Sequence, residues 1–198
     1  GAECEPYITS DYRRMMDEPE KVVEGLKVIL KLFESAKGYI CIEDNKPDCI
    51  DKMQKLVKDV PRIEVKELMT KYPQGGERTL IYAATGREIN STMLPADVGC
   101  VVDNVETVIS VYKAVILGRP VINRIVTVTG DGVKEPKNLC VLTGTDMSEL
   151  VDAAGGLKAK IAKAISGGPM MGFALYELHV PCTKTTSAFL FLEHDAVS

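Results

Sequence analysis

The sequence has no tryptophan, only two histidines, and no cysteines spaced as CxxC or CxxH. Metal and cluster sites usually take neighbouring ligands from one tight loop, so the six scattered cysteines predict no metal site and no iron–sulfur cluster in this stretch. The size of the chain and its lack of a signal-peptide pattern argue against a disulfide framework. The histidines, His179 and His194, offer no Ser/His/Asp or Cys/His arrangement, and we expect both on the surface.

Positive charge and long apolar runs are also scarce. The formal net charge is −4 and no Lys/Arg run stands out, which argues against the basic surface that nucleic-acid backbones require. No apolar run approaches the ~20 residues that cross a bilayer. With 45% hydrophobic and 26% charged residues, the composition is typical of a globular protein. We expect it in the cytoplasm, with any membrane association made through partner proteins.

The first 121 residues alternate between helical and strand patterns. Apolar residues recur at helical spacing in 18–37, 47–59, 77–86 and 104–118, and the segments 39–43, 62–68 and 98–102 have the pattern of strands. Helices alternating with strands predict an α/β domain with a mainly parallel sheet over residues 1–121. Cys41 and Cys100 fall in the strand patterns and should be buried.

The pattern changes after Pro120. Residues 122–130 alternate with period two, Asp131-Gly132 is a strong hairpin-turn signal, and 138–144 suits the returning strand. A short helix at 147–156 and a last strand at 187–193 follow. This order predicts a small α+β domain of the β-grasp type over residues 122–198.

Two stretches carry residue types that bind cofactors, although each also has a structural explanation. Glu3 and Glu5 lie two apart, so an extended segment would direct both to one side, where they would bind ribose or ring groups or simply face water. Gly75-Gly76 before a helix lets a ligand approach the backbone and the helix N-terminus, but it is also an ordinary turn.

Two further stretches also allow both a ligand-binding and a structural interpretation. Either Asp103 or Asn104 suits a helix N-cap, with Thr107 in the first turn, and capping alone explains this stretch. The loop 166–172 resembles a phosphate-binding glycine loop, yet its proline lacks an amide donor and no Lys-Ser/Thr follows, which favours a tight structural corner. Met170 and Met171 in that loop either fill the core or form a contact surface.

The order of these stretches is more specific than any one of them. The segments GAECEPYITSDYR, YPQGGERTLIYAATGREI, LPADVGCVVDNVETV, VTVTGDGVKEP and ISGGPMMG together resemble the C subunit of the Rnf ferredoxin:NAD oxidoreductase complex. The resemblance covers essentially the whole chain. More distantly, the same order resembles the NADH- and FMN-binding subunit of respiratory complex I. That family implies a Rossmann-like flavin domain followed by a soluble-ligand-binding β-grasp domain.

The resemblance implies contacts with the nicotinamide nucleotide and the flavin. Glu3 matches an acid near the flavin, and Glu5 matches an acid that contacts the nicotinamide nucleotide. Tyr72 matches an aromatic residue near the nicotinamide. The protein would then hold FMN against NADH, and the flavin itself would carry the hydride chemistry.

The resemblance also implies a second group of flavin contacts. Gly75, Gly76 and Glu77 match a Gly-Glu-Glu segment beside the flavin, with Gly76 in place of one of its two acids. Asn104 and Thr107 match a stretch that lines the flavin phosphate and ribityl chain.

Two sequence segments that are typical of this family lie outside this sequence. They are the glycine-rich loop that cradles the FMN phosphate, upstream, and the cysteine-rich segment that carries iron–sulfur clusters, downstream. Gly1 stands directly inside a motif, without a lead-in element. We therefore expect a piece of a longer protein, which binds FMN and NAD(H) at full length and holds neither tightly as this piece alone.

The resemblance implies a function and partners for the full-length protein. It would pass electrons between NAD(H) and iron–sulfur carriers through FMN, with ferredoxin reached indirectly. The other Rnf subunits would be its partners, and it would lie at the cytoplasmic face of the membrane. Two alternatives stay open: a soluble relative that serves another acceptor, such as a corrinoid or an amino-acid reductase, and a scaffold like the A subunit of the sodium-pumping quinone reductase.

Overall fold

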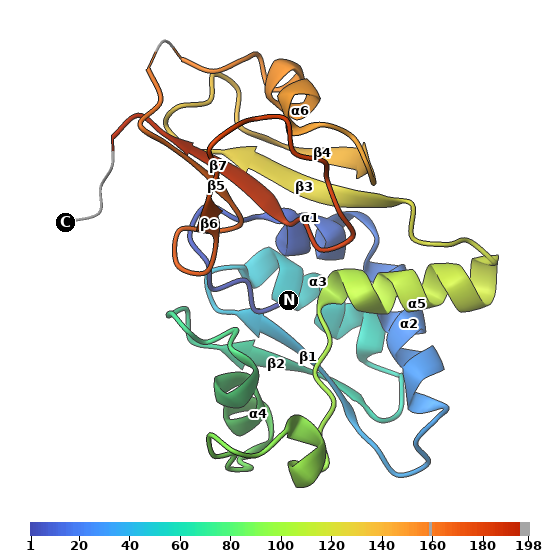
Figure 1. Ribbon diagram of the computed structural model, residues 1–198. Helices are drawn as coiled ribbons and strands as arrows, with labels where there is room; N and C mark the ends of the chain where they lie inside the picture. Colours follow the sequence, from blue (N-terminus) through green and yellow to red (C-terminus); the bar gives the residue numbers. More distant parts are fainter. Residues whose placement is uncertain (159, 195–198) are drawn as a thin grey trace. The chain divides into compact units, whose positions relative to one another are not determined.

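The computed structural model describes residues 1–158 and 160–194 and divides the chain into two compact units (Figure 1). The first unit contains Gly1–Cys4 and Asp11–Pro120. The second unit contains Glu5–Ser10 and the chain from Val121 on. The sequence places this division near residue 121, and Glu5–Ser10 lie with the second unit in the structure.

The first unit is an α/β layer around a short parallel sheet. Its elements are α1 (Ser10–Asp17), α2 (Pro19–Leu30), β1 (Gly38–Glu43), α3 (Pro47–Val57), β2 (Ile63–Leu68), α4 (Glu77–Thr85), the short 3₁₀ helix η1 (Pro95–Val98) and α5 (Val105–Leu117). Strands β1 and β2 pair in parallel, with Gly38 opposite Ile63 and Glu43 opposite Leu68. The crossover between them is α3, as parallel strands require.

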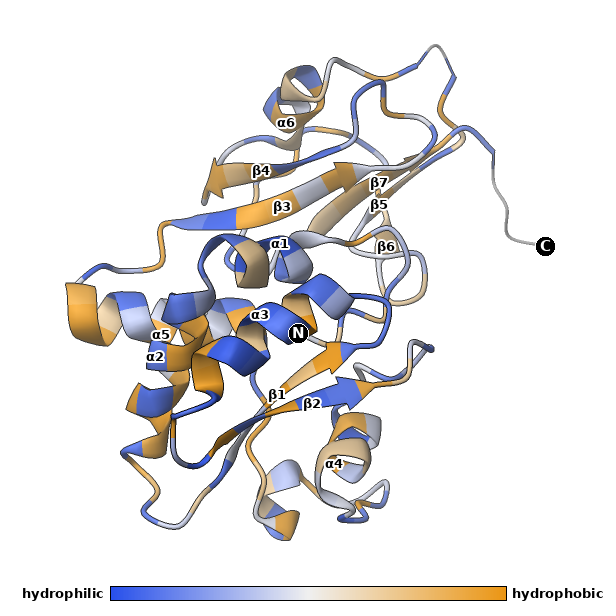
Figure 2. Cartoon of the chain, turned by 180° about the vertical axis from the view of Figure 1, so that it is seen from behind, coloured by the Kyte–Doolittle hydropathy of each residue, from blue (hydrophilic) through white to orange (hydrophobic). Residues whose placement is uncertain are grey.

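The core of the first unit lies between β1 and its helices. Five of the six residues of β1 are buried, which is the near-continuous apolar pattern of a parallel strand (Figure 2). Helix α2 packs against α5 and α3, and α3 packs against β2. The buried cluster consists of Met15, Val22, Val23, Leu30, Ile40, Ile42, Cys49, Ile50, Met53, Val57, Ile63, Val105 and Ile109. Cys41 is also buried, as expected.

Helix α2 ends earlier than its sequence pattern predicts. The expected helix over 18–37 stops at Leu30, and Phe33 is exposed instead of packing on the core. Beyond the helix, the Arg62 guanidinium donates to the carbonyl oxygens of Phe33 and Glu34, both at 2.9 Å. These long-range bonds hold the chain outside helical geometry.

Two further expectations for the first unit were wrong. The segment 98–102 is not a strand, because η1 ends at Val98 and Gly99 adopts a left-handed conformation with φ of 64°. Cys100 is consequently only partly buried. No element was predicted for Ser10–Asp17, which forms α1.

The second unit is a mixed sheet with one helix. Its elements are β3 (Asn123–Thr129), β4 (Lys137–Leu142), α6 (Met147–Ala153), β5 (Lys163–Ser166), β6 (Phe173–Ala174) and β7 (Ala188–Leu192). The strand order is β4-β3-β7-β5-β6, with β3 and β7 parallel and the other neighbours antiparallel. The expected hairpin, helix and last strand are confirmed, whereas β5 and β6 had no recognisable pattern in the sequence.

Strand β7 carries the core of the second unit. Its residues Ala188–Phe191 are buried between the neighbouring strands and α6. The buried cluster consists of Val126, Val128, Val133, Val141, Met147, Leu150, Val151, Ala154, Cys182, Phe189 and Phe191. Its neighbour β5 is fixed on it by antiparallel pairing, and the loop that follows β5 carries Met170 and Met171.

Candidate functional site: acidic residues of the N-terminal segment

Glu3 lies at the beginning of α1. Its carboxylate accepts hydrogen bonds from the backbone N–H groups of Asp11 (2.9 Å) and Tyr12 (3.3 Å). The first N–H groups of a helix have no partner inside the helix, and the positive end of the helix dipole favours a carboxylate there. Glu3 therefore caps α1 from outside the helix.

The carboxyl group of Glu3 has an altered proton affinity. Burial, followed by the negative charge of Asp11, raises the pKa of Glu3 from its usual 4.5 to about 7. The two backbone hydrogen bonds and the positive charge of Lys46 act in the opposite direction but do not offset burial. Glu3 can therefore exchange a proton near neutral pH, which a carboxyl group in water does not do.

This pKa predicts how stability depends on pH. Between about pH 5 and pH 7 the folded chain binds more protons than the unfolded chain, so its free energy of unfolding should fall as pH rises through this window. The contribution of Glu3 is most favourable below about pH 5 and is lost above about pH 7. Glu3→Gln should flatten this slope. Denaturant titrations at several pH values measure it, and an unchanged slope in Glu3→Gln would contradict the assignment.

The loop before α4 packs against the first residues of the chain. A Cβ atom on Gly75 would lie 2.3 Å from the carbonyl oxygen of Ala2 and 3.1 Å from Sγ of Cys4, so this approach requires glycine. Gly76 is the N-cap of α4, and within the described chain no side chain caps this helix. Its first N–H groups are therefore available to an anion, next to the exposed carboxylate of Glu77.

Asn104 links the start of α5 to the region around Glu3. Its Oδ1 accepts from the Glu106 N–H (2.8 Å) and so caps α5, while its Nδ2 donates to Oδ2 of Asp11 (2.6 Å). Asp11 in turn donates its N–H to Glu3. The structure therefore brings Glu3, Gly75 and Asn104 together within the first unit, although they lie far apart in the sequence.

Two other predicted site residues of the first unit are exposed to solvent. Thr107 lies in the first turn of α5 and is exposed, and Tyr72, in the loop before α4, is also exposed. Both lie on the elements that carry Asn104 and Gly75. Exposure at the start of α4 and α5 leaves these side chains accessible to a ligand.

A buried ion pair supports this arrangement and was not expected from the sequence. The Arg14 guanidinium donates from Nε to Oε2 of Glu106 (2.6 Å) and from Nη2 to Oε1 (3.2 Å), and both side chains are about nine-tenths buried. Arg14 also pairs with Glu18. The pair fixes α1 against the start of α5, where Asn104 and Thr107 lie. The sequence signal for this pair was Glu106 in the Asn-Val-Glu-Thr stretch, which the capping interpretation explained without a buried partner.

Glu5 differs from the other predicted site residues because it belongs to the second unit. Its Oε2 accepts a hydrogen bond from the N–H of Met170 (3.0 Å) in the loop between β5 and β6. Its Oε1 is buried and has no hydrogen-bond partner among the described residues. A buried carboxylate oxygen without a hydrogen-bond donor costs free energy, so a ligand that donates a hydrogen bond to this oxygen would lower that cost.

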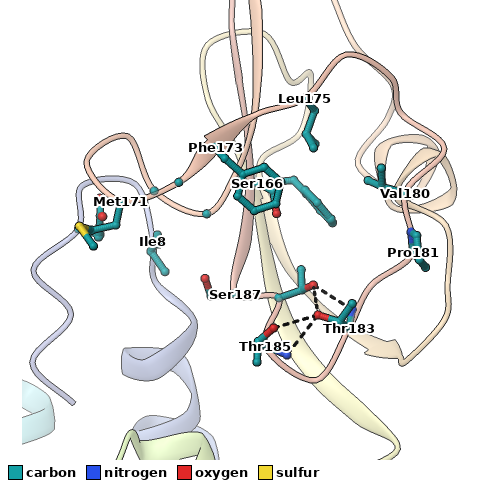
Figure 3. A pocket seen from close by; sticks show the side chains of 16 residues that line it. Ile8, Ser166, Met171, Phe173, Leu175, Val180, Pro181, Thr183, Thr185 and Ser187 are labelled. Carbon is teal, nitrogen blue, oxygen red and sulfur yellow. Dashed lines mark hydrogen bonds between the residues drawn. The ribbon is translucent and has the colours of Figure 1, made fainter.

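A cavity of about 380 Å³ lies beside Glu5 in the second unit (Figure 3). Its walls are apolar at Phe173 and Val180 and carry hydroxyl groups at Thr183 and Thr185 (Figure 3). Of the described residues that line it, Glu5 alone is charged. A phosphate group would meet a carboxylate there, so this loop is not a phosphate cradle.

The loop between β5 and β6 is a tight corner, as its glycines suggested. Gly167 has φ of 101°, and the N–H of Gly172 donates to the carbonyl oxygen of Gly168 (2.9 Å). Met170 and Met171 are 53% and 77% exposed, so the alternative that they fill the core is wrong.

The model of the Nuo51 FMN-binding domain matches residues 1–113, more than half of the chain. The chain belongs to this family. The SLBB domain model matches residues 125–174. The expected fold class, a Rossmann-like flavin domain followed by a small β-grasp domain, is thereby confirmed.

Individual relatives share more of the chain. It is 48% identical over 198 residues to the C subunit of the proton-translocating ferredoxin:NAD(+) oxidoreductase complex of Clostridium ljungdahlii, covering 100% of this chain and 43% of the relative. It is 44% identical over 196 residues to the C subunit of the Na(+)-translocating ferredoxin:NAD(+) oxidoreductase complex of Acetobacterium woodii, covering 99% of this chain and 44% of the relative. The chain thus spans less than half the length of these relatives.

A solved structure shows the same fold. The NAD+-reducing NiFe-hydrogenase in the air-oxidized state matches 96% of this chain and 39% of its own chain with a TM-score of 0.75, at 18% identity. At that identity the match concerns the fold alone. Among the described helices of the present chain, none has the length and apolar character needed to cross a membrane.

Proposed function

We propose that this chain is the FMN- and NAD(H)-binding part of the C subunit of an ion-translocating ferredoxin:NAD oxidoreductase, where it passes electrons between NAD(H) and iron–sulfur carriers. One observation carries the proposal: both units together, over essentially the full chain, match relatives that are C subunits of such complexes at 48% and 44% identity. The meeting of three separate motif segments around Glu3 supports it, because a cofactor needs contacts from several elements at one place.

The residues of the first unit fit a flavin nucleotide. The uncapped start of α4, at Gly75, Gly76 and Glu77, offers backbone N–H groups, and Asn104 and Thr107 offer polar side chains for phosphate or ribityl oxygens. Glu3 supplies a carboxyl group that holds a proton near neutral pH. When bound, FMN supplies the exchange of a hydride with NAD(H) and the release of single electrons. The protein supplies binding and orientation.

Glu5 fits a nicotinamide nucleotide. Its buried Oε1 lacks a donor among the described residues, and a carboxamide N–H or a ribose hydroxyl group is a suitable one. Such a bond would relieve the cost of the unpaired oxygen only when the nucleotide is present. We therefore assign Glu5 to recognition of NAD(H). For Tyr72, whose aromatic ring is exposed in the first unit, a contact with the nicotinamide stays a prediction from the resemblance alone.

The other subunits of such a complex are the proposed partners. The names of the relatives describe subunits of a complex that translocates protons in one organism and sodium ions in another. We place the protein as a peripheral subunit at the cytoplasmic face of the membrane, with iron–sulfur clusters in the remaining length and ferredoxin reached indirectly. These names favour a member of a ferredoxin:NAD(+) oxidoreductase complex over a soluble reductase for another acceptor.

Glu77 provides the test of the flavin site. In the full-length protein, Glu77→Gln should lower kcat/KM for NADH by about tenfold or more, because it removes a charged hydrogen-bonding group beside the flavin, while FMN content stays near that of the wild type. Glu88→Gln, another exposed glutamate beyond the same helix, is the matched control and should leave both quantities unchanged. Wild-type turnover in Glu77→Gln would remove Glu77 from the site.

Met170 and Met171 provide the test of assembly. Their exposure suits a contact surface, since methionine adapts to irregular partner surfaces. Replacing both with serine in the full-length protein should leave a stable, flavin-loaded subunit that fails to assemble with its partners. Co-purification with the other subunits and melting temperature are the two measurements. Normal assembly with full electron transfer in the double variant would show that the two methionines do not form a contact surface for the partner subunits.

A further inference from the structure

The segment Glu5–Ser10 is fixed on the second unit at both of its ends. At one end, Glu5 accepts the hydrogen bond from Met170. At the other end, the N–H of Thr9 donates to Oγ1 of Thr127 (3.3 Å), and its hydroxyl group donates to Oδ1 of Asn138 (3.3 Å). The side chain of Glu5 therefore extends from a backbone that is held on β3 and β4.

The loop between β5 and β6 closes tightly around the Glu5 carboxylate. A Cβ atom on Gly168 would lie 2.3 Å from Oε2 and 2.6 Å from Cδ of Glu5, so the loop backbone touches the carboxylate directly. The loop itself is fixed, since the N–H of Gly167 donates to Ala188 of β7 (2.8 Å) and that of Gly172 donates to Gly168 (2.9 Å). The contact thus has little freedom to move.

The two oxygens of Glu5 are consequently in different states. Oε2 is paired with the Met170 N–H, whereas Oε1 is buried and unpaired among the described residues. A carboxylate held through one oxygen has a fixed orientation, which presents the other oxygen to a donor at reduced entropic cost.

We propose that the Gly167–Gly172 loop of the second unit is a positioning element for NAD(H) recognition: Gly168 and the Met170 N–H orient Glu5 so that its Oε1 accepts a hydrogen bond from the nucleotide. The inference rests on the proposed function, because it assigns that role to Glu5. It gives the second unit a part in nucleotide affinity, in addition to any part in assembly.

Substitutions in the full-length protein test the inference. Gly168→Ala should raise KM for NADH about tenfold, because it displaces an oriented charged acceptor, while kcat at saturating NADH and FMN content are retained. Glu5→Gln should also raise KM, and the double variant should be no worse than Glu5→Gln alone, since the glycine acts through the glutamate. Glu149→Gln, at an exposed glutamate of α6 in the second unit, is the matched control for Glu5→Gln, and NADH kinetics should not change.

The outcomes separate the inference from the proposed function. If Glu5→Gln raises KM but Gly168→Ala does not, or if their effects add, the loop does not position Glu5 and the proposed function stands. If Glu5→Gln leaves KM unchanged, the assignment of Glu5 to NAD(H) fails and the inference fails with it. Amide exchange tests the contact without NADH: the Met170 N–H should exchange faster in Glu5→Ala, and an unchanged rate overturns the inference.

Discussion

Replacing Arg14 with methionine should lower the free energy of unfolding by about 3–5 kcal/mol, because it leaves the buried carboxylate of Glu106 without its partner. Arg14 donates two hydrogen bonds to Glu106, and the two side chains are 10% and 6% exposed. At this depth water cannot replace the guanidinium. Chemical denaturation of the purified chain measures the loss.

The neighbouring arginine gives a matched control. Arg13 pairs with Asp17, but its side chain is 54% exposed, so Arg13→Ala should cost less than about 1 kcal/mol. Replacing Arg14 with methionine and Glu106 with leucine together should recover much of the loss, because no buried charge is then left unpaired at that pair. Equal costs for Arg13→Ala and Arg14→Met would show that the pair is not buried in solution.

The second large effect is expected at Gly25 in α2. Helix propensity alone predicts that Gly25→Ala stabilises the helix by about 1 kcal/mol. The structure predicts the opposite sign, because a Cβ atom there would lie 2.2 Å from the carbonyl oxygen of Val108 in α5. That oxygen belongs to a helix backbone and cannot turn away, so α2 and α5 must separate. We expect a net loss of about 2–3 kcal/mol in the free energy of unfolding.

An exposed site on the same helix separates packing from propensity. Glu24→Ala, next in the chain, changes a side chain that is 48% exposed, and it should alter stability by less than about 0.5 kcal/mol. Thermal or denaturant unfolding of the two variants and the wild type makes the comparison. A stabilised Gly25→Ala protein would mean that the two helices do not approach as closely as the structure shows.

The candidate site shows the limits of reasoning from spacing. Glu3 and Glu5 lie two apart, and an extended segment would have directed both toward one side. Instead, Glu3 caps α1 in the first unit, and Glu5 is held by the β5–β6 loop of the second unit. The resemblance to Rnf C subunits pointed to both residues, but it gave no account of what holds either carboxylate in place.

The sequence by itself determined the local elements and the family. Apolar periodicity located α3, β2 and the hairpin of β3 and β4, because each of these has a buried face, and a continuous apolar run located β1, which is buried on both faces. The order of the motifs identified the relatives, which the comparisons then matched over the whole chain.

Only the tertiary structure decided which distant residues meet. Arg14 and Glu106 are 92 residues apart and Glu5 and Met170 are 165 apart, and both contacts depend on the path of the chain between them. Arg62 likewise binds the carbonyl groups of Phe33 and Glu34, 29 and 28 residues away, just beyond the end of α2. Local spacing does not encode such contacts, because the free energy that selects them comes from burial and hydrogen bonding between elements that are formed separately and then packed together.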